Sequence, residues 1–115
     1  MGGPSKKYFD VIQAHCLAKA GVIEDDPWGG GHYAWKVRGK IFAMTGAVTP
    51  GVSIKASLEK QAMLVMHPNI EPASYVGRYG WVTVQVEDDE VLELTLGLID
   101  EAYDSQAKGK RKVTG

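Results

Sequence analysis

Three basic residues and one tryptophan are the side chains of this sequence whose chemistry most suggests a ligand. Lys36 and Lys55 lie in two predicted strands, Arg78 precedes a third, and Trp81 opens that third strand. If the valines that alternate with Trp81 face the core, the indole ring points outward, on the side of the two lysines. Cations neutralise phosphates, and an exposed indole stacks on an unpaired base. The combination predicts a nucleic-acid surface, for single strands before duplex, because no helix is basic enough to enter a major groove.

The same face allows two other interpretations. The lysine stems can extend over the sheet while Trp81 packs under the connection from Pro72 to Gly80. An exposed tryptophan is also a common anchor of protein interfaces. The alternative function is therefore a protein-interaction or small-ligand-binding module that uses the same sheet face. The dependence of affinity on salt concentration discriminates between the nucleic-acid and protein-interaction functions, since phosphate binding weakens steeply with ionic strength and an aromatic-anchored protein contact changes less.

The sequence shows no set of nucleophile, base and orienting partner. Cys16 has apolar neighbours in an amphipathic segment, which is typical of a small core residue. His15 is adjacent to Cys16, but adjacent helical side chains point about 100° apart, so no catalytic pair follows. His32 and His67 have no zinc-ligand spacing. The prediction is a non-enzymatic protein without a cofactor.

Two acidic clusters and a glycine run have simple structural interpretations. Residues 24–26 and 87–90 offer carboxylates for a divalent cation if folding joins them. The first cluster follows one predicted helix and the second opens another, so capping and solvation account for both, and no metal site is predicted. Residues 29–31 are glycines that lead into a strand without the Gly-Lys-Ser/Thr ending of a phosphate loop. They indicate a turn.

A hairpin positions the first of the lysines. Two runs of alternating apolar and polar residues meet at Arg38-Gly39, which predicts that Val37 pairs with Lys40 across a two-residue turn. This register assigns one face to the core, namely Tyr33, Trp35, Val37, Phe42 and Met44. The opposite face is then a mixed surface made of His32, Ala34, Lys36, Ile41 and Ala43.

Around this hairpin the periodicity predicts an α+β domain. A helix is expected over residues 6–20, a strand over 52–56, a short helix capped by Ser57 that ends near Met66, a strand over 81–86, and a last helix from Asp88 or Asp89. The expected architecture is an antiparallel sheet with the N- and C-terminal helices packed on one face.

Composition places this fold in a single domain. The 115 residues, 44% hydrophobic and 23% charged, fit one core over about residues 6–107, with a basic tail at 108–115. No apolar run approaches the roughly 20 residues that span a bilayer, there is no signal peptide, and the single cysteine suits a reducing compartment. A cytoplasmic location without membrane contact is expected. The net charge of −1 argues against a general polyanion binder and leaves room for a local basic patch.

The order and spacing of several segments resemble the MmcQ/YjbR family over about residues 8–107. These segments are Glu24-Asp25-Asp26-Pro27-Trp28-Gly29, Trp35 to Ala43, Ile54-Lys55-Ala56, Trp81, and Leu98 to Asp104. The resemblance implies a compact α+β fold similar to frataxin and to the double-wing DNA-binding domain of a phage transcription factor. The DNA-binding role that comes with the family rests on that likeness of fold, and no catalytic reaction comes with it.

The candidate site consists of the residues that match the family pattern, namely Lys36, Lys40, Lys55, Trp81 and, as a basic equivalent, Arg78. The chain departs from the family before Trp81. Other members have a run rich in histidine, asparagine and lysine there, whereas this sequence reads Tyr75-Val76-Gly77-Arg78-Tyr79-Gly80. The predicted partner of the candidate site is nucleic acid or another protein, with no membrane partner.

Overall fold

A computed structural model of the chain describes residues 6–26, 32–46, 49–74 and 76–108. The elements in chain order are α1 (Lys6–Leu17), β1 (Ile23–Asp25), β2 (Tyr33–Val37), β3 (Lys40–Gly46), β4 (Thr49–Ile54), α2 (Leu58–Leu64), β5 (Ile70–Pro72), the 3-10 helix η1 (Gly77–Tyr79), β6 (Val82–Val84) and α3 (Asp89–Lys108). The predicted turn at 29–31 lies outside the described residues, as does the predicted basic tail beyond Lys108, which itself ends α3.

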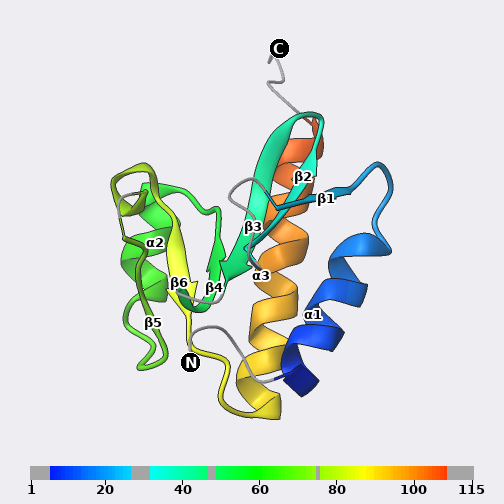
Figure 1. The fold of residues 1–115 in the computed structure, drawn as a ribbon. Coiled ribbons are helices and arrows are strands. Elements are labelled where there is room, and N and C mark those ends of the chain that lie inside the picture. The colour runs from blue at the N-terminus through cyan, green and yellow to red at the C-terminus, as the bar shows by residue number, and fades with distance from the viewer. Residues whose placement is uncertain (1–5, 27–31, 47–48, 75, 109–115) are drawn as a thin grey trace, which may run out of the picture.

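The strands form one antiparallel sheet in the order β1-β2-β3-β4-β6-β5. Figure 1 shows α1 and α3 side by side against one face of this sheet, which confirms the predicted α+β architecture. Both helices bury residues three or four positions apart, the spacing of a single helical face. These residues are Ile12 and Cys16 in α1, and Val91, Thr95, Leu98, Ile99 and Ala102 in α3.

The β2–β3 hairpin has the predicted turn but a different distribution of side chains. Val37 pairs with Lys40, and the turn residues between them have positive φ, as a two-residue type I′ turn requires. A bulge then shifts the register, so that Trp35 pairs with Ala43 and the next pair contains Met44. Directly opposed residues share a face. The prediction that placed Met44 on the core face and Ala43 on the outer face is therefore wrong, because the extra residue at the bulge reverses them.

A partly buried polar contact links α1 to the sheet. Trp35 is fully buried, and its Nε1 donates to Glu24 Oε1 at 2.9 Å. The same oxygen accepts from Gln13 Nε2 at 2.8 Å, so β1, β2 and α1 meet at one carboxylate. Glu24 belongs to β1, a strand that the sequence pattern did not predict. A three-residue edge strand has too few residues to show the alternation that identifies longer strands.

The segment from β4 to β6 contains the elements that matter for the candidate site. Ser57 caps α2 as predicted, since its side chain accepts from Lys60 N at 3.0 Å. The connection after α2 contains β5, another three-residue strand that the sequence pattern did not reveal. None of the helices in the described ranges is long and apolar enough to cross a membrane.

Candidate functional site

Trp81 is buried, with only 8% of its surface exposed. Its carbonyl accepts from Ala73 N at 3.1 Å and from Gln61 Nε2 at 2.8 Å, so the end of β5 and α2 both lie against this residue. Val82 belongs to the main core cluster and Trp81 does not. The prediction of an exposed ring is wrong, because Trp81 is buried where α2 and the residue after β5 pack against its backbone.

The two hairpin lysines do not share a surface. Lys36 is on the outer face of β2, where its Nζ lies 3.1 Å from Asp25 Oδ2 on the neighbouring strand. Lys40 is opposed to Val37 and so belongs to the other face of the hairpin. Figure 1 places this hairpin turn apart from α2 and β6. The structure therefore does not join Lys36 and Lys40 into one site with the remaining candidates.

Lys55 and Arg78, in contrast, both contact Tyr79, one at its backbone carbonyl and the other at its ring. The Lys55 Nζ lies 3.5 Å from the Tyr79 carbonyl oxygen, and the Arg78 guanidinium lies 5.3 Å from the centre of the Tyr79 ring. Tyr79 is 59% exposed. We call these three residues the Tyr79 platform. Sequence reasoning missed Tyr79, although an arginine next to an aromatic residue in a turn bounded by glycines was a visible signal.

The charges of the two platform cations are not neutralised by carboxylates of the described residues. Within the described ranges, neither Lys55 nor Arg78 forms an ion pair with a carboxylate. Within the described part of the chain, the hydrogen bonds of the Lys55 ammonium go to backbone carbonyls, at 3.3 Å to Ala56 and 3.5 Å to Tyr79. Their positive charge is thus available to an anionic ligand.

Gly80 holds the platform together by close backbone packing. It has a φ of 97°, and a Cβ at this position would lie 2.5 Å from the Ala56 oxygen and 2.7 Å from the Ser57 carbonyl carbon. Gln61 adds a hydrogen bond of 2.7 Å to the Gly77 carbonyl at the other end of η1. The 3-10 helix is therefore seated directly on the connection that follows Lys55.

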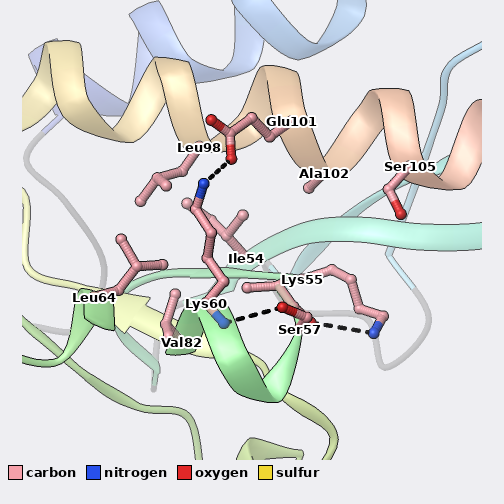
Figure 2. Close-up of a pocket in the computed structure, with 11 residues that line it drawn as sticks. Ile54, Lys55, Ser57, Lys60, Leu64, Val82, Leu98, Glu101, Ala102 and Ser105 are labelled. Carbon is pink, nitrogen blue, oxygen red and sulfur yellow. Dashed lines mark hydrogen bonds and ion pairs between the residues drawn. The ribbon is translucent and has the colours of Figure 1, made fainter. Parts of the chain in front are cut away.

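A pocket of about 270 Å³ opens beside the platform, between α2, α3, β4 and β6 (Figure 2). Lys60 of α2 reaches across it to Glu101 of α3, with 2.5 Å between Nζ and Oε1. Lys55 belongs to its wall. The full set of lining residues is Ile54, Lys55, Ala56, Ser57, Lys60, Leu64, Val82, Leu98, Glu101, Ala102 and Ser105.

Besides the contact at Glu24, a polar cluster around Asp100 joins the end of α1 to α3. His15 Nε2 lies 2.7 Å from Asp100 Oδ1, and Lys19 Nζ lies 2.5 Å from the same oxygen. The Lys19 hydrogen bond, with a further one from His15, lowers the pKa of Asp100. Cys16 beside them is fully buried, and burial raises its pKa to about 12, so it is a neutral thiol at neutral pH. These contacts with Asp100 hold α1 and the residues after it against α3. They could not be predicted from the sequence, because the partners are more than 80 positions apart.

The acidic clusters serve local structure. Asp88 Oδ1 accepts from Val91 N at 2.9 Å, which is the capping role predicted for residues 87–90. Residues 24 and 25 instead lie in β1, where they bind Trp35 and Lys36. In the described part of the chain, no group of three or more His, Cys, Asp or Glu residues is arranged to hold a metal ion.

The comparisons with known proteins agree with this fold. The YjbR family model matches residues 17–105, which include the platform and the pocket. The fold is similar to the crystal structure of the Deinococcus radiodurans protein DR2400, a DUF419 domain, with a TM-score of 0.71 and 25% identity over 83% of this chain and 75% of that chain. No curated protein matches the sequence. The chain therefore belongs to the YjbR family, also called MmcQ/YjbR, as its motifs predicted.

Proposed function

We propose that this chain is a non-enzymatic binding module that holds single-stranded nucleic acid on the Tyr79 platform. The observation that supports the proposal is an exposed aromatic ring with the Arg78 guanidinium over it and the Lys55 ammonium at its backbone carbonyl, neither cation having a carboxylate partner among the described residues. The Tyr79 ring offers a flat surface to an unpaired base, while Lys55 and Arg78 neutralise the adjoining phosphates. Tyr79 thus takes the stacking role that the sequence assigned to Trp81.

Single strands suit this platform better than duplex. A base must leave its stack to lie on a side-chain ring, and a single strand does so at low cost. Exposed acidic residues along α3, including Asp89, Glu90 and Asp104, would repel a duplex backbone laid over the helices. The platform also lies on a 3-10 turn, which cannot enter a major groove as a recognition helix does.

The proposal is tested by titrating labelled single-stranded and duplex oligonucleotides at several salt concentrations. Each phosphate contact to a single strand contributes about −0.7 to the slope of log binding constant against log salt, so two cations predict a slope of about −1.4. Lys55→Gln and Arg78→Gln should each make that slope shallower by about 0.7. Tyr79→Ala should weaken binding about 5-fold to 150-fold at constant salt, as expected for one lost base stack.

Matched controls separate the platform from charge in general. Lys7→Gln removes an exposed cation on α1 and should leave the slope for a short oligonucleotide unchanged. Lys36→Gln and Lys40→Gln test the hairpin lysines in the same way and should also leave the slope unchanged. Absence of binding at low salt, or a Tyr79→Ala variant that binds like the parent, would refute the proposal.

One observation favours a protein partner as the second candidate. α2 and its C-terminal end expose large apolar side chains, with 58% of Leu58, 69% of Met63 and 83% of Met66 accessible. Methionine-rich surfaces adapt to varied partners. If oligonucleotides fail to bind, Met63→Lys and Met66→Lys are the variants to compare in a pull-down with the parent, because a partner on this face should lose affinity for both.

A further inference from the structure

The pocket beside the platform combines an apolar interior with a charged rim. Figure 2 shows Leu98 and Ala102 of α3 above Ile54 and Val82 of the sheet, and Leu64 of α2 at one end. Its volume of about 270 Å³ is slightly below the usual range for drug-sized ligands, about 300 to 1,000 Å³. A small molecule with an apolar body fits this space.

The charged residues of the pocket favour a ligand with a negative charge. Lys60 is neutralised by Glu101 across the pocket, whereas Lys55 has no acidic partner among the described residues. The two lysines and one glutamate leave the rim with one net positive charge. Among the residues that the structure describes, the Lys55 ammonium makes two long hydrogen bonds, both to carbonyls, of 3.3 and 3.5 Å. A carboxylate would offer it a shorter, charge-assisted bond.

We propose that this pocket binds a small organic monocarboxylate with a short aliphatic or single-ring body. The body lies against Ile54, Val82 and Leu98, and the carboxylate accepts from Lys55 Nζ. Ser57 and Ser105 also line the pocket and bring hydroxyl groups that can donate hydrogen bonds. The inference stands without the nucleic-acid proposal, although Lys55 belongs to both sites.

The test is an NMR titration of the 15N-labelled full chain with acetate, butanoate, hexanoate and benzoate. Hexanoate and benzoate should shift the amides of residues 54–57 and 98–105 saturably. Affinity should rise about fourfold for each methylene added between acetate and hexanoate, the value of one buried methylene. Hexanol and benzyl alcohol, which match the body without the charge, should bind at least tenfold more weakly.

Variants assign the binding to this pocket. Lys55→Met keeps the aliphatic stem and removes the charge, so it should lose the preference for hexanoate over hexanol, while Lys40→Met is the matched control and should retain it. Ser105→Trp should block the pocket and leave oligonucleotide binding intact. Tyr79→Ala should do the reverse, which separates failure of this proposal from failure of the platform. Shifts that do not saturate, or Lys55→Met binding hexanoate as tightly as the parent, would overturn the inference.

Discussion

Substitution of Gly80 by alanine should destabilise the protein far more than the same change at Gly39. Both glycines have a positive φ, 97° and 78°, so alanine at either position adopts a left-handed conformation that costs about 1–2 kcal/mol. Their surroundings differ. A Cβ at Gly39 meets nothing within 4 Å, whereas one at Gly80 falls 2.5 to 2.9 Å from backbone atoms of Ala56, Ser57 and Leu58.

The overlap at Gly80 sets the size of the difference. Backbone atoms cannot move aside as a flexible side chain does, so η1 must separate from the connection after β4. Overpacking of this kind costs about 1–3 kcal/mol. Added to the conformational cost, it gives about 2–5 kcal/mol for Gly80→Ala against about 1–2 kcal/mol for Gly39→Ala. At roughly 4 °C per kcal/mol, the Tm falls by about 8–20 °C and about 4–8 °C, respectively.

Urea unfolding followed by tryptophan fluorescence measures both variants, and thermal unfolding checks the order. The Gly80→Ala variant, under conditions in which it is folded, should also bind single-stranded oligonucleotide more weakly, since Lys55 and Tyr79 lose their fixed spacing. The Gly39→Ala variant should bind like the parent. Equal destabilisation by the two substitutions would refute the reasoning, because it would mean that the backbone contact at Gly80 contributes nothing.

Three further predictions concern the core and the helix contacts. Trp35→Phe leaves Glu24 without the indole donor, and should cost about 1–3 kcal/mol in urea unfolding; a loss below about 0.5 kcal/mol would contradict this role of the hydrogen bond. Cys16 should react with a thiol reagent at pH 8 only in denaturant, because burial raises its pKa to about 12; rapid modification of the native protein is the contrary result. Asp100 has a lowered pKa, so its carboxylate stabilises the folded state above its unfolded pKa of about 3.9, and that contribution disappears as pH falls through the folded pKa. The stability gap between the parent and Asp100→Asn should therefore narrow below about pH 4, and a constant gap from pH 7 to pH 3 would show that the ion pair is not responsible.

Features set by a few neighbouring residues were predictable from the sequence. The Arg38-Gly39 turn and the Ser57 cap depend on side chains and backbone conformations within one turn, and the structure has both. The bulge in the hairpin could not be predicted. Either alternation pattern buries apolar residues there, and packing of the whole sheet decides between Ala43 and Met44.

The candidate site was predicted less completely, because it also depends on contacts between segments that are distant in the sequence. Alternation predicts a face for Trp81 but not its burial, which accompanies contacts with Ala73 and with Gln61 of α2 that form only in the tertiary fold. Similarly, Lys55 and Arg78 are 23 positions apart in the sequence and both reach Tyr79 because Gly80 lets η1 pack on the connection that follows Lys55. Contacts of this kind have no local signature.

The most direct test of the account is the NMR signal of the Tyr79 ring during titration with a short single-stranded oligonucleotide. A base stacked on the ring should move its resonances upfield by its ring current, with the same midpoint as the binding curve and with a midpoint that rises with salt. Tyr79 resonances that stay in place while the oligonucleotide binds and other residues respond would contradict the central claim, because the strand would then lie elsewhere.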